Sequence, residues 1–166
     1  MKLVILTGAS GAGKTTIAQA FGERFPDDAS VFRFDSIGVP STERMIEDHG
    51  SPEGWQRAKA LEWLTRLARI DGNVLFEGQV RIAFLKEAAA MAGLSAHMIV
   101  LVDCDDETRR RRLALERLQP ELATPAMFDW ARFLRAEAER GAHPILDTSA
   151  LSLDECILWV RRRFST

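Results

Sequence analysis

The segment Gly8-Ala9-Ser10-Gly11-Ala12-Gly13-Lys14-Thr15 decides how this chain folds. A glycine, four further residues, a second glycine, a lysine and a threonine make the pattern of a phosphate-binding loop. Its glycines leave the backbone free to turn N–H groups inward, and these groups form an anion-binding nest at the positive end of the following helix. The segment therefore predicts a site for the phosphates of a nucleotide.

The residues on either side have the character that such a loop needs. Residues 2–7 are a short apolar run rich in β-branched residues, which is typical of a strand buried on both faces. Residues 14–25 carry apolar side chains at spacings of three and four, which predicts a helix. In the loop, Lys14 supplies charge for the β- and γ-phosphates and the Thr15 hydroxyl can bind Mg²⁺. The loop residues expected to hold ATP are Gly8, Ala9, Ser10, Gly11, Ala12, Gly13, Lys14, Thr15 and Thr16.

Strand and helix patterns alternate along the rest of the chain. Further strands are expected at residues 31–34, 74–76, 97–102 and 144–146, and further helices at 42–48, 53–70, 82–92, 106–118, 126–140 and 152–164. Ser51, Thr124 and Ser152 have the character of helix N-caps, and Glu155 completes a capping box. This alternation predicts an α/β fold with a doubly wound, five-stranded parallel sheet, in which ligands bind at the carboxyl ends of the strands.

Length and charge favour a single domain over residues 1–166 that binds small molecules. The chain has 166 residues and a net charge of −2, so neither a nucleic acid nor an anionic membrane is expected as a partner. No apolar run is long enough for a signal peptide or a membrane span. Cys104 and Cys156 are far apart and are expected to be buried thiols in a reducing cytoplasm. Both a monomer and a homodimer fit the sequence.

Two carboxylates follow expected strands and are candidates for the site. Asp35 comes at the end of the second strand, where it can accept the proton of a hydroxyl that attacks the γ-phosphate, or only cap a turn or helix. Glu77 directly follows the third strand, where it can hold Mg²⁺ through a water, or only cap the helix that begins near Ile82.

Basic and aromatic residues supply further candidates. The planar fork of Arg81 suits a phosphate or an acidic substrate group, although the residue can also be a solvated helix start. The arginines at 109–112 and at 117 either include ligand-binding side chains or form a solvated face paired with nearby acids. The four tryptophans fall at helical spacings, which favours core packing over base stacking. They are Trp55, Trp63, Trp130 and Trp159.

The order of these pieces resembles the P-loop kinases of the adenylate-kinase-like group, which includes nucleoside, nucleotide and shikimate kinases and small-molecule phosphotransferases. Glu77-Gly78-Gln79-Val80-Arg81 is similar to the Asp-Gly-Phe-Pro-Arg segment of that family, with Glu in place of Asp. The resemblance implies that Arg81 meets an acceptor phosphate and that Arg112 stacks on adenine. It also implies a helical acceptor-binding insertion at about residues 36–72 and a short lid at about residues 117–130.

One departure from the family bears on the acceptor. Nucleotide kinases usually carry an arginine a few residues after the aspartate that matches Asp35, and Ser36-Ile37-Gly38-Val39 supplies none. The pair Asp35-Ser36 instead resembles phosphotransferases that modify hydroxyl groups of antibiotics, in which this aspartate is the base.

The resemblance therefore implies an ATP-dependent kinase that transfers the γ-phosphoryl group of Mg-ATP to a hydroxyl of a nucleoside, a sugar or an antibiotic-like alcohol. Its expected catalytic residues are Lys14, Asp35 and Arg112, with Thr15 and Glu77 organising Mg²⁺. Two alternatives stay open. One is a nucleoside-monophosphate kinase that uses Arg44 and Arg81 on the acceptor phosphate, and the other is a nucleotide-binding regulatory module that transfers no phosphate.

Overall fold

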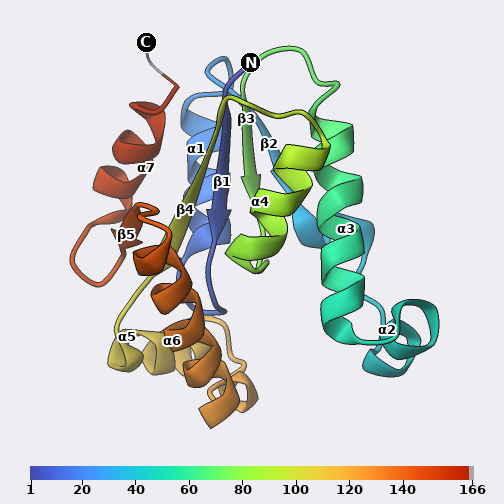
Figure 1. Ribbon diagram of the computed structural model, residues 1–166. Coiled ribbons are helices and arrows are strands. Elements are labelled where there is room, and N and C mark those ends of the chain that lie inside the picture. Colours follow the sequence, from blue (N-terminus) through green and yellow to red (C-terminus); the bar gives the residue numbers. More distant parts are fainter. Residues whose placement is uncertain (165–166) are drawn as a thin grey trace.

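The computed structural model describes residues 1–164 and shows a parallel sheet between two layers of helices (Figure 1). The five strands lie in the order β2-β3-β1-β4-β5, as expected for a doubly wound α/β fold. Their bounds are β1 Leu3–Thr7, β2 Ser30–Arg33, β3 Val74–Glu77, β4 His97–Asp103 and β5 Ile145–Asp147.

The helices follow the predicted order closely. They are α1 Lys14–Arg24, α2 Thr42–His49, α3 Pro52–Leu67, α4 Ile82–Met91, α5 Asp106–Arg111, α6 Pro125–Arg140 and α7 Leu153–Arg161, with 3₁₀ turns η1 Phe34–Ile37 and η3 Pro120–Leu122 and a π-helical segment η2 Arg112–Glu116. Ser51, Thr124 and Ser152 cap α3, α6 and α7, and the capping box with Glu155 is confirmed. No helix within residues 1–164 has the length and apolar character that crossing a membrane requires.

The central strand β1 feeds two separate hydrophobic cores. Leu3 and Ile5 belong to the core under α3, α4 and α6, whereas Val4 and Leu6 belong to the core under α1 and α7. Because both faces of the sheet are covered, apolar side chains point to both sides of this strand from Leu3 to Leu6. The phosphate-binding loop thus begins at the end of a strand that is buried along its whole length.

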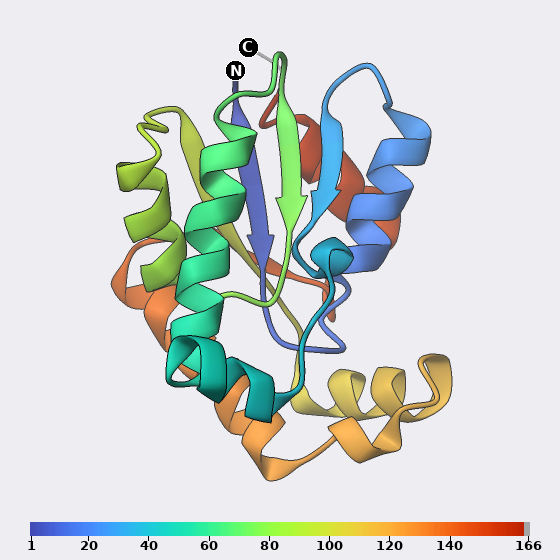
Figure 2. The ribbon, with the colours of Figure 1, turned by 90° about the vertical axis from the view of Figure 1, so that its right-hand side faces the viewer.

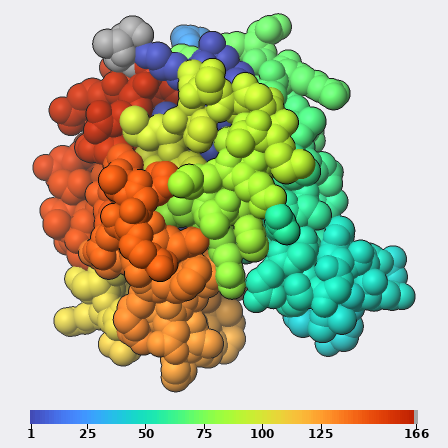
Figure 3. All heavy atoms as spheres, in the orientation of Figure 1, coloured from blue at the N-terminus to red at the C-terminus, as the bar shows by residue number. Residues whose placement is uncertain are grey.

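The carboxyl ends of the strands all point to one end of the molecule, where α2 and α5 also lie (Figure 2). The phosphate-binding loop follows β1 at this end, Glu77 ends β3 and Asp35 comes soon after β2. Figure 3 shows α2 and its surroundings standing out from the body, with an indentation between them and the region of α6. The expected insertion and lid segments therefore flank the ligand-binding end of the sheet.

The structure corrects the expected end of the second strand. β2 stops at Arg33, because Phe34 turns inward and is only 2% exposed. The carbonyl of Phe34 accepts a hydrogen bond from Trp63 Nε1 at 3.1 Å, and its ring packs edge-on against Trp55. Asp35 consequently lies in the 3₁₀ turn η1 and not at the end of a strand. The same contacts confirm core packing for these two tryptophans.

The expected single helix at 106–118 is wrong beyond Arg111. From Arg112 the helix widens into a π-helical segment, in which the N–H of Arg117 donates to the Arg112 carbonyl five residues earlier at 2.9 Å. Leu118 then takes a left-handed conformation with φ of 53°, which ends the segment. The wider turn brings Arg112 and Arg117 to the same side of the helix, and such segments are often found at functional sites.

Thr7 ties the end of β1 to the loop that follows β3. Its hydroxyl donates to the Val80 carbonyl at 2.5 Å and accepts from the Val80 N–H at 3.2 Å, and the side chain is fully buried. This side chain thus extends the pairing of β1 with β3, which ends at Leu6 and Glu77, into the two segments that supply the phosphate-binding loop and Glu77.

We expect Thr7→Val to lower the free energy of unfolding by about 2 kcal/mol, because valine fills the same space but leaves the buried N–H and carbonyl of Val80 unpaired. Urea unfolding of the protein without ligand measures the change. Thr65→Val on the exposed side of α3 is the matched control and should have little effect. Equal stability of the two variants would contradict the prediction.

Candidate functional site

The phosphate-binding loop is pressed against its neighbours at two glycines. Gly8 has φ of 150°, and a Cβ at this position would collide with the carbonyl oxygen of Val102 in β4. Gly11 has φ of 78° and lies against the side chains of Arg109 and Leu113. Both positions have a backbone conformation that favours glycine, and Gly8 leaves no room for a side chain while Gly11 would leave a tight fit. The shape of the loop is therefore fixed by β4 on one side and by α5 and η2 on the other.

Lys14 lies buried in the mouth of the loop, where its Nζ donates to the Ala9 carbonyl at 3.2 Å. Burial lowers the pKa of Lys14 from 10.5 to about 8, although the nearby carboxylates of Glu77 and Asp35 act in the opposite direction. A buried ammonium group with a lowered pKa is short of negative charge around it. Bound phosphates would supply that charge.

Thr15 and Glu77 form a pair of oxygen donors beside this lysine. The Thr15 hydroxyl donates to Glu77 Oε1 at 3.1 Å, and burial raises the pKa of Glu77. Within residues 1–164 no group of three or more His, Cys, Asp or Glu side chains forms a metal site. One hydroxyl and one carboxylate nevertheless fit Mg²⁺, which is usually held by one or two protein groups together with phosphates and water. Glu77 does not cap α4, whose N-cap residue is Arg81.

Asp35 completes a group of charges at the ends of three neighbouring strands. It is exposed, and its charge influences the pKa values of both Lys14 and Glu77. The N-cap residue of its own 3₁₀ turn is Arg33, so Asp35 is not a cap there. The structure therefore brings together three of the site residues that the sequence singled out, from the loop after β1, the turn after β2 and the end of β3.

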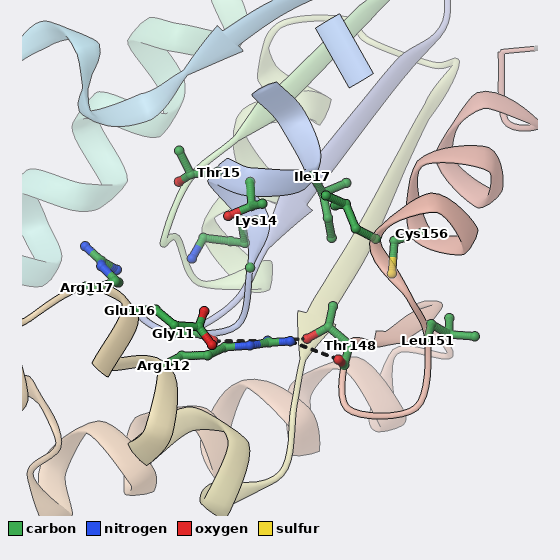
Figure 4. A pocket seen from close by; sticks show the side chains of 13 residues that line it. Gly11, Lys14, Thr15, Ile17, Arg112, Glu116, Arg117, Thr148, Leu151 and Cys156 are labelled. Atoms are coloured by element: carbon green, nitrogen blue, oxygen red, sulfur yellow. Dashed lines mark hydrogen bonds between the residues drawn. The ribbon is translucent and has the colours of Figure 1, made fainter. Parts of the chain in front are cut away.

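A pocket of about 380 Å³ opens beside the loop (Figure 4). Its size suits part of a small-molecule ligand. It is lined by residues of the loop and α1, of η2 and its end, and of the turn after β5 and α7: Gly11, Gly13, Lys14, Thr15, Thr16, Ile17, Arg112, Glu116, Arg117, Thr148, Leu151, Leu153 and Cys156. Arg117 belongs to the arginine cluster that the sequence offered as a possible ligand contact, although an ordinary α-helix would turn it away from Arg112. Glu116 was not expected to line a ligand pocket.

Arg112 runs along the floor of this pocket and is held at both ends of its guanidinium group. Nη1 donates to the Thr148 hydroxyl at 2.7 Å and to the carbonyls of Gly11 and Ala12 at 3.3 Å, and Nη2 donates to the Thr148 carbonyl at 3.0 Å. Figure 4 shows the side chain stretched from Gly11 to Thr148. A guanidinium fixed in this way presents a flat, charged surface to the pocket. Its stacking on adenine stays a prediction.

Two other expected contacts with the ligand are engaged elsewhere. Arg44 is paired with Glu47 and Asp48 on its own helix, each at 2.9 Å. Arg81 lies 3.7 Å from Glu53 and over a group of aromatic rings, the nearest 5.0 Å from its guanidinium carbon. These rings belong to Phe84, Trp130 and Phe133. Neither arginine is among the residues that the structure brings together with Lys14.

Arg109 fits neither of the two alternatives for the arginine cluster, because it is neither a pocket-lining side chain nor part of a solvated face. Its side chain is 0% exposed and forms an ion pair with Asp103 at 2.5 Å, whereas Arg110 lies over the ring of Phe128 at 4.5 Å. Four arginines in succession thus have different surroundings. The burial of Arg109 could not be predicted from the residue pattern, because it depends on pairing with Asp103 at the end of β4.

The AAA domain family matches residues 4–124 of this chain. The chain belongs to the AAA domain family. A curated relative from Anaeromyxobacter sp. (strain K), named "Nucleotide-binding protein", is 28% identical over 168 residues, which cover 98% of this chain and 52% of that protein. The chain therefore spans about half the length of the curated relatives it matches.

Solved structures of kinases share the fold of this AAA-domain chain. A shikimate kinase from Acinetobacter baumannii in complex with shikimate has a TM-score of 0.65 at 18% identity, over 96% of this chain and 90% of that one. A gluconokinase from Sinorhizobium meliloti 1021 has a TM-score of 0.67 at 13% identity, over 99% and 91%. The fold is that of the P-loop kinases of the adenylate-kinase-like group, as the sequence resemblance implied.

The lowered pKa of Lys14 predicts how nucleotide binding by this AAA-domain protein depends on pH. In the protein without nucleotide, Lys14 loses its proton as the pH rises through about 8. Bound phosphates would stabilise the charged form of Lys14. ATP affinity should therefore fall by up to about tenfold between about pH 8 and about pH 9, and binding in that range should take up a proton. Calorimetry in buffers of different ionisation heat measures both effects.

Lys14→Arg is the control for this prediction, because an arginine side chain stays charged over the whole range. Its ATP affinity should be weaker but independent of pH between about 7 and 9. A wild-type affinity that stays constant, without proton uptake, would contradict the assignment of Lys14.

The surroundings of Arg112 generate a second prediction. Arg112→Lys should weaken ATP binding by about 1 kcal/mol although charge is retained, because lysine lacks the flat fork that reaches both Thr148 and the loop. Arg110→Lys is the matched control and should do almost nothing to the dissociation constant measured by calorimetry. Comparable losses from both substitutions, or none from either, would mean that the arginine cluster is a solvated face and that adenine is held elsewhere.

Proposed function

We propose that this protein is an ATP-dependent kinase that transfers the γ-phosphoryl group of Mg-ATP to a hydroxyl group of a small molecule. The observation that carries the proposal is the convergence of Lys14, Glu77 and Asp35 beside the pocket at the phosphate-binding loop. A cation, a metal-binding carboxylate and an available carboxylate base are the groups that phosphoryl transfer to a hydroxyl requires.

Each residue has a distinct part in the proposed reaction. The loop N–H groups and Lys14 bind the phosphates of ATP. Arg112 holds the adenine ring and adds positive charge to the site. Asp35 accepts the proton of the attacking hydroxyl group. As the hydroxyl oxygen bonds to the γ-phosphorus, the bond between this phosphorus and the oxygen of the leaving ADP breaks. Mg²⁺, held through Thr15 and Glu77, would offset the charge of the β- and γ-phosphates. Catalysis is then mainly positioning and electrostatic stabilisation.

The surroundings of two arginines support a hydroxyl acceptor over a phosphate acceptor. A nucleoside-monophosphate kinase would need Arg44 and Arg81 on the acceptor phosphate, and both are engaged by acids or aromatic rings. The likeness to a shikimate kinase and a gluconokinase supports a small-molecule acceptor. Residues 36–72 would bind this acceptor, and residues 117–130 would close over it as a short lid.

A nucleotide-binding module that transfers no phosphate is the second candidate. The curated relatives are named only for nucleotide binding, and this chain matches about half of their length. In such a module the same loop and pocket would bind ATP, and the response would lie in another part of the protein.

ATP consumption in the presence of a panel of acceptors separates these candidates. Nucleosides, sugars and antibiotic-like alcohols test the hydroxyl acceptor, and nucleoside monophosphates test the phosphate acceptor. Stimulation by a hydroxyl compound, with its phosphate ester found by mass spectrometry, supports the proposal. ATP binding without consumption on any acceptor supports the second candidate, and stimulation by a monophosphate alone overturns the choice of acceptor.

With the active acceptor, Asp35→Asn should reduce turnover by about a hundred- to ten-thousand-fold and change ATP affinity little, because the amide keeps the shape but accepts no proton. Asp71→Asn, on an exposed turn before β3, is the matched control. Steady-state kinetics with calorimetry of ATP binding measure the two effects. Unchanged turnover of Asp35→Asn would exclude Asp35 as the base.

A further inference from the structure

Arg109 makes a buried contact with the outer side of the phosphate-binding loop. Its Nη1 donates to the carbonyl of Ser10 at 2.7 Å, and Nη2 donates to Asp103 Oδ1 at 2.5 Å and to the Cys104 carbonyl at 3.3 Å. One rigid, planar guanidinium group thus joins the loop after β1 to the end of β4.

Asp103 holds that guanidinium group in a fixed orientation. The carboxylate is buried, and its second oxygen accepts from Arg135 Nε of α6 at 2.8 Å. Because the prongs of an arginine fork keep a fixed geometry, fixing Nη2 on Asp103 aims Nη1 at Ser10.

Stability alone does not account for the buried ion pair of Arg109 and Asp103. Arg109 Nε is buried without a hydrogen-bond partner among the described residues. Burying ions is costly, and well-packed apolar side chains of similar volume are often at least as stable in such places. The contact with the loop offers a reason for an arginine here that packing does not.

The peptide unit between Ser10 and Gly11 explains what the contact achieves. In a trans peptide the N–H points away from the C=O, so a Ser10 carbonyl held outward directs the Gly11 N–H to the opposite, phosphate-binding side. Gly11 has φ of 78°, and as a glycine it would let this peptide unit rotate to other orientations. The hydrogen bond from Arg109 to the Ser10 carbonyl restricts the rotation of this peptide unit that Gly11 would otherwise allow.

The neighbouring carbonyls of the loop are held in the same way. The Gly11 carbonyl accepts from Arg112 and from Cys104 Sγ, and the Ala12 carbonyl accepts from Arg112 and from the Thr148 hydroxyl at 2.8 Å. Three successive carbonyls therefore bond to groups outside the loop, and Arg109 supplies the first of these bonds. Unlike Arg112, Arg109 does not line the pocket.

We propose that Arg109 is a positioning residue, which holds the Ser10 carbonyl outward so that the loop presents its N–H groups to the phosphates of the nucleotide. The inference rests on the proposed function only in that the loop binds a nucleotide. It assigns to Arg109 a contribution to phosphate affinity without any contact to the ligand.

Arg109→Lys tests the proposal, because a lysine can pair with Asp103 or reach the Ser10 carbonyl but cannot hold both in one plane. Three probes are titrated by calorimetry: Mg-ATP, inorganic tripolyphosphate, which occupies the loop alone, and adenosine, which carries no phosphate. Affinity for ATP and for tripolyphosphate should fall by the same factor, about tenfold or more, as for one lost charge-assisted hydrogen bond. Adenosine affinity should not change.

Arg135→Lys is the matched control, since Arg135 shares Asp103 but makes no hydrogen bond to the loop. It should leave all three affinities unchanged. Wild-type tripolyphosphate affinity in Arg109→Lys would overturn the proposal, and so would an equal loss of adenosine binding, which indicates a general structural role. If Arg109→Lys does not fold, the double variant Asp103→Asn/Arg109→Gln removes both buried charges together and should show the same selective loss.

Failure of this proposal can be told apart from failure of the proposed function. The assay measures binding and not turnover. Selective loss of phosphate affinity in a protein that phosphorylates no acceptor would support the role of Arg109 and contradict the kinase. Turnover on a hydroxyl acceptor, with full phosphate affinity in Arg109→Lys, would do the reverse.

Discussion

The enclosure of β1 on both faces is the constraint on which the rest of the structure depends. The strand lies between β3 and β4, so its end meets theirs at the middle of the sheet. A loop that leaves such a strand has little space, and Gly8 is pressed against β4 at its first residue. The conformation of the phosphate-binding loop is thus restricted by the segments packed around it, and its glycines allow the backbone to take that conformation.

Charge in the site is balanced only in part by the protein itself. Lys14 is buried against a backbone carbonyl. Burial lowers the pKa of Lys14 and raises the pKa of Glu77, so it favours the neutral form of each group. A nucleotide with its cation would add negative charge beside the lysine and positive charge beside the glutamate. The bound nucleotide and its cation would then offset the free energy cost of burying the charges of Lys14 and Glu77. Affinity for phosphates is thereby coupled to the stability of the loop.

The sequence predicted the loop, the order of the elements and Glu77 at the end of the third strand, because short patterns encode local backbone geometry and strand ends meet at one edge of a parallel sheet. It placed Asp35 at this edge too, but at a strand end and not in the 3₁₀ turn where it lies. It could not predict features that arise from contacts between distant segments. Phe34 ends β2 early because the rings of Trp55 and Trp63 lie beneath it. Arg109 is buried because Asp103 and a loop carbonyl meet there. The roles given to Arg44 and Arg81 came from resemblance, which carries no information on the acids and rings that surround them.

The π-helical segment at 112–116 has a consequence for how relatives of this chain should be compared. A π-helical turn accommodates one residue more than an α-helical turn over the same stretch of helix. The N–H of Arg117 bonds back five residues to Arg112, where an uninterrupted α-helix would bond back four. A relative with a continuous helix would therefore carry the counterpart of Arg117 four, not five, positions after the counterpart of Arg112. Its alignment with this chain would need a gap of a single residue here, and a gapless alignment would pair Arg117 with a position on the wrong face of the helix.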